Sequence, residues 1–541
     1  LKGYGNNLWE GKGSGIQVNG TLNAVGTSEN PIVFTSKQDD SYGGDTNNDG
    51  SGTTPASGQW TSHYIAAGGV ATFEHTLLRY AGGSMYGILQ ESIYNVGGTL
   101  HLSNNTIEYG SGTGVRSGAS GVIDIHDNEV FRADFQAMEM RGFSHYVRGV
   151  PAEQITVIVP RICGVCSTAH QVASVKALED VFGVVPPPLA EDIREVLLLG
   201  QLIQNQATSL FIFTMPDRVN ASSLFELSRS EAGKARAFSL AQMALRIRKI
   251  GTDLISLAGG QFIHPIKTVI GGVTSGIPRV KADQLILTIE ELLPVATDLL
   301  DIYWDLSMQM VDRIGSWGDD EPTHYLASTE ANNYRLNSRR LRVMKPDGSE
   351  APSFDPHEFE AYLQITESEY SYAGISSYLG HIMRANSLAR VNLAESFGTP
   401  LADAYRERFV ETFGKPAHAI MFFDLCRGIE LVYALEKARQ MLSGDLEHGE
   451  TEIGYTPRDS TGFGLVEAPR GPLIHRYEVE NGLIKSADFV IPTVHNMLAI
   501  RRALTVVAKR YVSHEGIDAE LERAVGRVVR AFDPCIACAT K

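Results

Sequence analysis

Cysteine and positive charge are both scarce in this 541-residue sequence, and each shortage excludes a class of protein. Five cysteines are too few for a small scaffold held together by disulfides. Lysine and arginine number 47 against 63 aspartates and glutamates, and the net charge of -16 opposes the clustered cations that bind nucleic acid. Nucleic acid is therefore not an expected partner.

Long hydrophobic runs are also missing from the sequence. No uninterrupted apolar run approaches the ~18 to 20 residues that cross a bilayer, so no transmembrane segment is expected. A basic start followed by an apolar stretch is not visible either, so the sequence shows no signal peptide. With 43% hydrophobic and 20% charged residues the composition is that of a globular protein, and the length predicts more than one domain.

Glycine is distributed unevenly and divides the chain in two. Residues 1–130 hold 24 of the 53 glycines and none of the cysteines. Short runs with alternating apolar residues are separated there by Gly, Asn and Ser, a pattern that predicts strands and turns with almost no helix. Residues 98–107 (GTLHLSNNTI) align with residues 121–130 (GVIDIHDNEV) at a period of 23 residues, and Asn105 matches Asn128.

A repeat of this length fits one coil of a solenoid, in which stacked coils share an aliphatic core and asparagines bond to neighbouring backbone. Residues 1–130 resemble right-handed parallel β-helix proteins of the polysaccharide-active and surface-repeat kind. Residues 45–50 (DTNNDG) have the order of the first half of a calcium loop, but Ala56 stands where the glutamate of that loop belongs. An Asx-rich surface turn is the preferred interpretation of this stretch.

After about Val130 the hydrophobic pattern becomes helical. Apolar residues recur at helical spacing in residues 192–215, 281–314, 497–511 and 518–532. Several long amphipathic helices predict a mainly α-helical bundle, with minor β pieces such as residues 482–492 (GLIKSADFVIP). The expected architecture is therefore multidomain, with a β-helix segment over residues 1–130 and a helical domain over residues 131–541.

Four of the five cysteines form two CxxC pairs, Cys163 with Cys166 and Cys535 with Cys538, and Cys426 stands alone as an expected buried apolar residue. Two intervening residues let both sulfurs of a pair turn toward one point, so the pairs offer four thiolates to a soft or borderline metal. A structural zinc clip and a core metal centre are both open. The 368 residues between the pairs exceed the span of a zinc ribbon and favour the core centre. A thioredoxin-like dithiol is disfavoured, because no βαβ pattern surrounds either pair.

Five motifs carry a resemblance to the large, catalytic subunits of nickel-iron hydrogenases over about residues 131–541. They are RICGVCSTAH at 161–170, HPIKTVIGGV at 264–273, GLVEAPRGPLIH at 464–475, IPTVHN at 491–496 and DPCIAC at 533–538. The resemblance implies the large-subunit fold and reversible heterolytic cleavage of dihydrogen into protons and electrons. The cofactor it implies is a Ni-Fe centre whose iron carries carbon monoxide and cyanide.

Partners follow from the same resemblance. An iron-sulfur small subunit is expected, because this chain has no further cysteine pairs for an electron relay. Maturation proteins are expected as well, since many family precursors are cut close to the last cysteine before the site closes. Such an enzyme would be cytoplasmic or associated with a membrane through its partners, whereas a β-helix alone is typical of an extracellular protein.

The resemblance also assigns roles to individual residues. Cys163 and Cys535 are expected to bind nickel terminally, and Cys166 and Cys538 to bridge nickel and iron. Six further residues are expected around the metals: His170, Pro469, Arg470, Pro492, Thr493 and Asp533.

Among these six, His170 would hydrogen-bond a bridging thiolate, and Thr493 would anchor a cyanide. Arg470, near Asp533, would lie above the open position and help to polarise dihydrogen. Without the motifs, a buried histidine, an ordinary ion pair and a helix-ending turn would explain the same residues.

The chain departs from the family pattern at three places. Residues 1–130 replace the usual N-terminal strands with their glutamate-glycine motif. Ser144 stands where a glutamate often follows Arg-Gly-Phe, and Lys541 stands where a histidine follows the last cysteine. Both lost groups belong to a magnesium site, and an ammonium group has no lone pair to offer, so magnesium is not expected.

The join between the segments has two interpretations, a natural fusion and an artefactual join. The artefact predicts rapid proteolysis between about residues 128 and 140 that releases two stable fragments. Two other functions stay open. One is a non-catalytic hydrogenase-derived subunit, like the quinone-reducing respiratory subunits that lack the cysteine pairs. The other is carbohydrate binding by the β-helix through scattered residues such as Asp124, His126 and Glu129.

Overall fold

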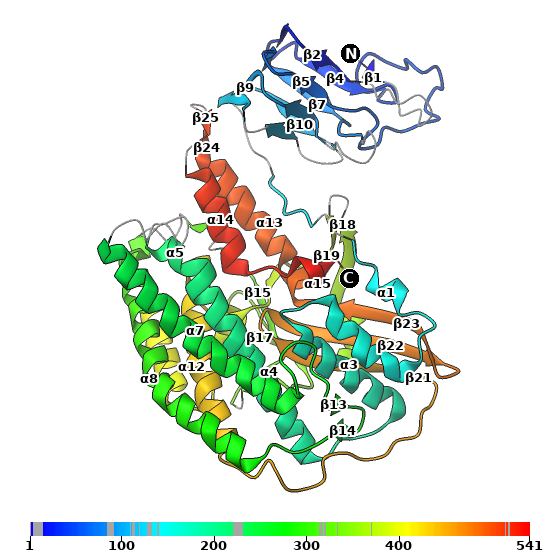
Figure 1. Ribbon diagram of the computed structural model, residues 1–541. Coiled ribbons are helices and arrows are strands. Elements are labelled where there is room, and N and C mark those ends of the chain that lie inside the picture. Colours follow the sequence, from blue (N-terminus) through cyan, green and yellow to red (C-terminus); the bar gives the residue numbers. More distant parts are fainter. Residues whose placement is uncertain are drawn as a thin grey trace. The chain divides into compact units, whose positions relative to one another are not determined.

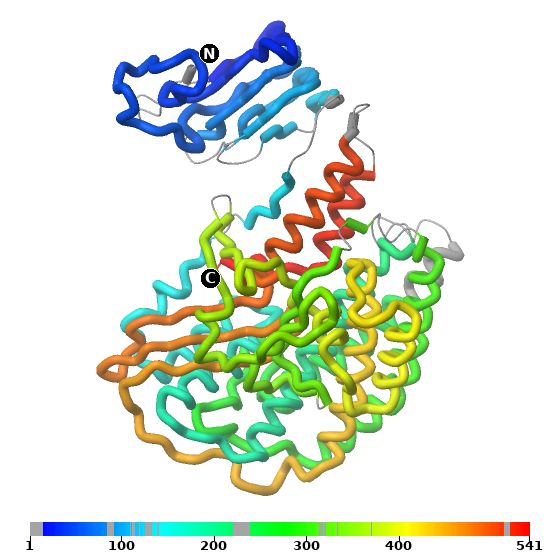
Figure 2. The backbone as a smooth tube through the Cα atoms, turned by 180° about the vertical axis from the view of Figure 1, so that it is seen from behind, coloured from blue at the N-terminus to red at the C-terminus, as the bar shows by residue number. Residues whose placement is uncertain are grey.

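Two units, each folded around its own hydrophobic core, make up the chain in the computed structural model (Figures 1 and 2). Unit 1 comprises Leu1–Ala133 with Thr505–Glu522, and unit 2 comprises Asp134–Leu504 with Arg523–Lys541. The structure describes residues 2–3, 15–83, 91–108, 110, 114–117, 120–126, 132–137, 140–219, 231–312, 317–318, 321–332, 334–368, 371–513, 516–517 and 520–540.

The N-terminal strands of unit 1 form three four-stranded sheets in which every neighbouring pair is parallel. Each strand pairs with the strand three places further along the chain, giving the orders β1-β4-β7-β10, β2-β5-β8-β11 and β3-β6-β9-β12. No helix occurs in the described part of residues 1–126, as the sequence predicts. The strands are β1 (Lys2–Gly3), β2 (Gln17–Val18), β3 (Thr21–Val25), β4 (Ile32–Ser36), β5 (His63–Ile65), β6 (Val70–Glu74), β7 (Thr76–Arg79), β8 (Ile93–Asn95), β9 (Thr99–Ser103), β10 (Thr106–Glu108), β11 (Val115–Ser117) and β12 (Val122–His126).

An aliphatic column runs through the third of these sheets. Leu22, Ala71, Leu100 and Ile123 stand in register on successive strands, and they contribute to the core of unit 1. The pairing of Thr99 with Val122 confirms the predicted period of 23 residues for this step. Stacking alike residues in this way lets each coil bury its apolar face against the next.

Polar side chains at the turns bond to backbone, as predicted for this segment. Asn105 accepts a hydrogen bond from the amide of Thr76 at 2.9 Å and donates one to the carbonyl of Phe73 at 2.8 Å. Its sequence match, Asn128, lies outside the described residues. Asp45 accepts from the amide of Gly50 at 2.8 Å, so the acidic stretch forms the Asx-type turn that the sequence predicts.

Long helices build one side of unit 2. They are α4 (Pro188–Thr208), α7 (Glu231–Gly259), α8 (Arg279–Met308) and α12 (Phe423–Leu442) (Figure 1). Helices α4 and α7 cross closely at Gly200 and Gly251, where a Cβ on Gly251 would lie 2.5 Å from the carbonyl oxygen of Gly200. The prediction for residues 281–314 was too long, because α8 ends at Met308.

The expectation that no segment could cross a membrane needs one correction. Residues Pro188–Arg218 form a helical stretch, α4 followed by a π-helical turn and α5 (Met215–Arg218), that is long and apolar enough by length and composition. However, 83% of its most apolar window is buried inside the structure. That burial is typical of a core helix, so this stretch is weak support for a membrane span.

An antiparallel sheet lies against helix α3 (Ser167–Phe182) and positions the site. It consists of β21 (Ser460–Ala468), β22 (Gly471–Glu480) and β23 (Leu483–Val490), so the predicted β piece at 482–492 is one strand of a larger sheet. Gly464 allows the close approach, since a Cβ there would lie 1.9 Å from the carbonyl oxygen of Ala173. The approach brings β22 over one face of α3.

Shorter elements complete the fold. The remaining strands are β13 (Thr268–Val269), β14 (Gly272–Val273), β15 (His324–Ala327), β16 (Leu341–Met344), β17 (Glu350–Phe354), β18 (Leu363–Ser368), β19 (Ser371–Tyr378), β20 (Met383–Arg384), β24 (Val512–Ser513) and β25 (Gly516–Ile517). The remaining helices are α1 (Phe143–Tyr146), α2 (Ile155–Ile158), α9 (Phe359–Tyr362), α10 (Ser387–Leu393), α11 (Pro400–Phe413), α13 (Pro492–Tyr511), α14 (Leu521–Phe532) and α15 (Ile536–Ala539). The helices predicted in residues 497–511 and 518–532 correspond to α13 and α14.

Candidate metal centre

The first cysteine pair is set by the start of helix α3. Cys163 follows a short 3-10 turn over Val159–Ile162 and has an extended backbone, and Cys166 is the N-cap of α3. The amide of Cys166 points at Cys163 Sγ, 3.4 Å away. The CxxC spacing thus turns both sulfurs toward the same side of the helix start, as the sequence predicts.

The second pair follows a tight turn at the end of α14. Asp533 has a left-handed backbone with φ of 48°, which ends the helix, and Pro534 then directs the chain away. Cys535 is the N-cap of the short helix α15, and Cys538 lies within that helix. The positive φ at Asp533 is what aims the second pair back at the first.

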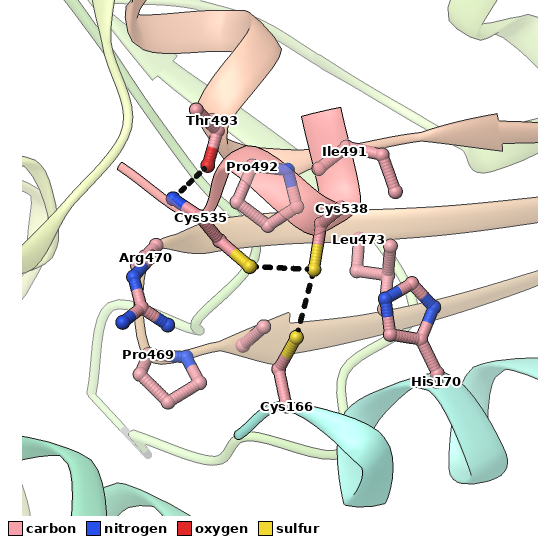
Figure 3. A pocket seen from close by; sticks show the side chains of 11 residues that line it. Cys166, His170, Pro469, Arg470, Leu473, Ile491, Pro492, Thr493, Cys535 and Cys538 are labelled. Carbon is pink, nitrogen blue, oxygen red and sulfur yellow. Dashed lines mark hydrogen bonds between the residues drawn. The ribbon is translucent and has the colours of Figure 1, made fainter. Parts of the chain in front are cut away.

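The two pairs meet at one point, although they are far apart in the sequence. Cys163 and Cys535 have their sulfurs 3.4 Å apart, Cys166 and Cys538 2.9 Å apart, and Cys535 and Cys538 2.8 Å apart (Figure 3). All four are free cysteines, and their sulfurs lie within 4.8 Å of one another. These separations exceed the ~2.05 Å of a disulfide, so the cluster is a set of separate sulfur ligands.

The charge of this cluster fits a bound metal. Four buried thiolates at such distances would repel one another strongly, so protons or a cation must lie among them. Hydrogen bonds from Cys166, Cys535 and Cys538 lower the pKa of Cys163, whereas burial raises the pKa of Cys538. Metal ions displace thiol protons because the thiolate is the binding form, and four sulfurs select a soft or borderline metal. Cys426, by contrast, is fully buried within α12, as predicted for a lone apolar cysteine.

A cation from the protein lies beside the sulfurs. The guanidinium of Arg470 is 2.9 Å from the carboxylate of Asp533, and its Nε donates to the carbonyl of Asp533. Burial opposes the charge on Arg470, but Asp533 and the sulfurs of Cys535 and Cys166 outweigh it and raise the pKa of the guanidinium. Arg470 is therefore a permanent, fixed positive charge at the edge of the cluster.

A small cavity opens between these groups. Its lining comprises Cys166, His170, Ala468, Pro469, Arg470, Leu473, Ile491, Pro492, Thr493, Cys535 and Cys538 (Figure 3). All of the residues expected around the metals except Asp533 and Cys163 line it, and those two contact lining residues directly. Thr493 accepts a hydrogen bond from the amide of Cys535 at 3.0 Å.

His170 differs in detail from the expectation. Its Nδ1 lies 3.0 Å from Nε2 of His475, and no hydrogen bond between His170 and a cysteine occurs among the described residues. Burial lowers the pKa of His170 to about 4, so the imidazole is neutral near pH 7. The role predicted for its ring therefore depends on Nε2, because Nδ1 is taken by His475.

Sequence reasoning missed Arg390, which holds the loop before Arg470. This arginine is fully buried in α10, and its guanidinium donates to the carbonyls of Ala468 at 3.2 Å and Pro469 at 2.8 Å. Two buried carboxylates, those of Glu430 and Glu467, balance its charge. No motif spacing links residue 390 to the site, so nothing in the sequence marked it.

Arg141 links the two cysteine pairs through backbone. Its amide donates to the carbonyl of Thr540 at 3.1 Å, and its side chain donates to the carbonyl of Ile162 at 2.7 Å. Ser144 lies in α1, close behind it in the sequence, whereas Lys541 lies outside the described residues. The hydroxyl of Ser144 is a poor substitute for a carboxylate in a magnesium site.

Together the fold and the site define a metal-thiolate enzyme built from a helical bundle and a sheet. A family model described as nickel-dependent hydrogenase matches residues 141–243 and 316–541, more than half of the chain. The chain belongs to that family, whose members are oxidoreductases that act on dihydrogen. The four-cysteine cluster and this membership support a Ni-Fe centre at these residues.

Relatives align over most of their own length. One of the proteins that make up the F420-non-reducing hydrogenase vhu of Methanococcus voltae is 34% identical over 378 residues, which cover 68% of this chain and 90% of that protein. The NAD-reducing hydrogenase HoxS subunit beta of Cupriavidus necator is 28% identical over 448 residues, covering 78% and 92%. The similarity therefore extends through nearly the whole length of these relatives.

Solved structures agree with the fold. An NAD+-reducing [NiFe]-hydrogenase in the H2-reduced state superposes with a TM-score of 0.70 at 27% identity, covering 76% of this chain and 94% of that one. A [NiFeSe] hydrogenase variant from Desulfovibrio vulgaris Hildenborough gives 0.61 at 21% identity, covering 77% and 94%, and shows the fold alone. The large-subunit fold expected from the sequence is thereby confirmed.

Proposed function

We propose that this chain is the catalytic subunit of a nickel-iron hydrogenase and performs the reversible heterolytic cleavage of dihydrogen. The observation that carries the proposal is the meeting of four cysteine sulfurs with the Arg470–Asp533 ion pair at one cavity. A structural zinc site needs no fixed cation and no cavity beside its sulfurs. A site that polarises a small neutral molecule uses both.

The ligand roles follow the family pattern. Cys163 and Cys535 would bind nickel terminally, and Cys166 and Cys538 would bridge it to an iron that carries carbon monoxide and cyanide. When bound, this centre supplies the open position for dihydrogen and takes up its electron pair. The hydroxyl of Thr493, on the cavity wall, would donate to a cyanide.

The protein's own groups handle charge and protons. Arg470 holds a fixed positive charge beside the cavity and favours the separation of charge within dihydrogen. The proton would pass to Sγ of Cys535, which is the least buried of the four cysteines. Asp533 keeps Arg470 in place through the ion pair and the carbonyl bond.

Electrons would leave to an iron-sulfur small subunit. Apart from the four ligand cysteines, this chain has only Cys426, which is buried and cannot build a relay. Magnesium does not fit the residues, because Ser144 takes the place of a carboxylate, and we assign no step to it.

Infrared spectroscopy tests the proposal directly. Protein matured with its accessory proteins should show the stretching bands of bound carbon monoxide and cyanide, together with nickel and iron in equal amounts. The bands should change when dihydrogen replaces argon. Stoichiometric metal without such bands would contradict the proposal and favour a non-catalytic hydrogenase-derived subunit.

For the N-terminal unit, we infer a parallel β-helix. The support is the repeated order of its three sheets, in which each strand pairs with the third strand after it. The inner strands β6 and β9 bond on both sides and should exchange their amide hydrogens more slowly than β11 and β12, which pair on one side. Equal exchange rates would count against stacked coils.

A further inference from the structure

Helix α3 and strand β22 face each other through two pairs of polar side chains. His170 and Ser174 lie one helical turn apart on α3, and His475 and Tyr477 lie two residues apart on β22, so each pair shares one face of its element. The close approach at Gly464 brings the two faces within hydrogen-bond distance.

The four side chains form one continuous hydrogen-bond chain. His170 Nδ1 lies 3.0 Å from His475 Nε2, and His475 Nδ1 lies 2.7 Å from the hydroxyl of Tyr477. That hydroxyl is in turn 2.9 Å from Ser174 Oγ. All four residues are at most 1% exposed, so the groups bond to one another where water does not reach them.

The chain can point in either of two directions. A neutral imidazole has one donor and one acceptor nitrogen, and each hydroxyl can donate while it accepts. If Ser174 donates to Tyr477 and Tyr477 donates to His475 Nδ1, then His475 Nε2–H donates to His170 Nδ1. The single proton of His170 then lies on Nε2. In the opposite direction His170 Nε2 carries a lone pair instead.

We propose that Tyr477 and His475 are positioning residues that fix the tautomer of His170, so that its Nε2–H is presented to the cysteine sulfurs. This inference rests on the proposed function. His170 lines the same cavity as Cys166 and Cys538, and its Nδ1 is already bonded, so Nε2 is the nitrogen available to the sulfurs. Thiolate sulfur accepts hydrogen bonds and does not donate them, so it favours the direction that ends in N–H.

An N–H bond to sulfur draws electron density away from the metals that the sulfur binds. Carbon monoxide and cyanide on iron report this density, because more density on the metal weakens their bonds and lowers their stretching frequencies. Replacing Tyr477 with Phe removes the hydroxyl that donates to His475 Nδ1. The imidazole of His475 then carries its proton elsewhere, and His170 can turn a lone pair toward the sulfurs.

The experiment compares infrared bands and metal content in the mature protein. Tyr477→Phe should keep nickel and iron and shift the bands of both ligands to lower wavenumber. Ser174→Ala should leave the bands in place, since Tyr477 can still donate to His475. Tyr325→Phe is the matched control, because its buried hydroxyl contacts His418 Nδ1 at 2.6 Å, away from the cysteines, and it should shift nothing.

A double variant makes the test independent of metal loading. The side-chain amide of glutamine donates without help from Tyr477, so Tyr477→Phe/His475→Gln should return the bands toward their original positions. If Tyr477→Phe alone loses its metals, the double variant should restore them with those bands. Unchanged bands in Tyr477→Phe, an equal shift in Tyr325→Phe, or no restoration in the double variant would overturn the inference. Absence of all bands in the unmodified protein would instead count against the proposed function.

Discussion

The backbone amide of Cys535 donates a hydrogen bond to Oγ1 of Thr493 across 3.0 Å. This contact joins the first turn of α13 to the residue that caps α15, and so ties the second cysteine pair to the end of the sheet. Because Oγ1 acts as the acceptor here, its own hydrogen is available to a group in the cavity. One threonine can thereby position a ligand cysteine and donate to the cofactor.

Thr493→Val should weaken both interactions while it keeps the shape of the side chain. An unsatisfied amide at Cys535 destabilises the fold by about 1–3 kcal/mol. We expect a lower midpoint of urea unfolding and a reduced nickel content. Thr156→Val is the matched control, since that buried hydroxyl bonds only the carbonyl of Glu153 among the described contacts. Equal nickel loss in both variants would contradict a local role.

Cys538→Ala should abolish nickel retention, because three sulfurs then remain where four converge. Cys426→Ala removes a thiol of equal burial from α12 and should keep the metal. Elemental analysis of both purified variants checks the difference. Full nickel and iron in Cys538→Ala would refute the ligand assignment.

Arg390→Met should destabilise unit 2 by about 3–5 kcal/mol, because it leaves the buried carboxylates of Glu430 and Glu467 without their cation. It also frees the carbonyls of Ala468 and Pro469, and so the loop that carries Arg470. Arg408→Met breaks a half-exposed pair with Asp301 and should change stability by less than about 1 kcal/mol. Urea unfolding of both variants measures the contrast, and similar losses would argue against a special role for Arg390.

His63 makes unit 1 sensitive to acid. Its ring packs among Phe34, Trp60 and Phe73, both of its nitrogens lack a hydrogen-bond partner, and burial lowers its pKa to about 3. Above pH 6.5 the ring is neutral in the folded and unfolded chain, and it adds no pH dependence. Between pH 6.5 and about 3 the unfolded chain binds a proton that the folded chain excludes, so stability decreases as pH falls, by about 1.4 kcal/mol per pH unit.

His63→Phe removes this titration and keeps an aromatic ring in place. Urea unfolding at pH 7.5 and pH 5 should therefore show a smaller loss of stability in the variant than in the original protein. His75→Phe is the control, because that histidine is only partly buried. The same acid sensitivity in His63→Phe would show that other groups control it.

The metal centre was predictable because its information is local. Each CxxC spacing turns two sulfurs together, and the motifs around Arg470 and Asp533 placed the ion pair correctly. Tyr477 was not predictable in the same way. Its spacing of two from His475 acquires meaning only when β22 lies against α3, and that contact depends on the absence of a side chain at Gly464.

The repeats of unit 1 show a second limit of sequence reasoning. The step from Thr99 to Val122 spans 23 residues and was recognised, but Thr21 pairs with Val70 and Val70 with Thr99. Those steps include longer loops, which change the period and hide the alignment of otherwise equivalent strands. A fixed repeat length therefore detects only the coils that have no inserted loop.

The distance in sequence between the two cysteine pairs also gives the metal a mechanical role. Cys163 and Cys535 are 372 positions apart, so a metal held by both closes a loop that contains most of unit 2. In the chain-entropy description, a cross-link around a loop of that length lowers the entropy of the unfolded chain by an amount worth about 6 kcal/mol at 25 °C. A loaded chain should accordingly refold more readily than one stripped by a chelator, since its two ends of the site never separate.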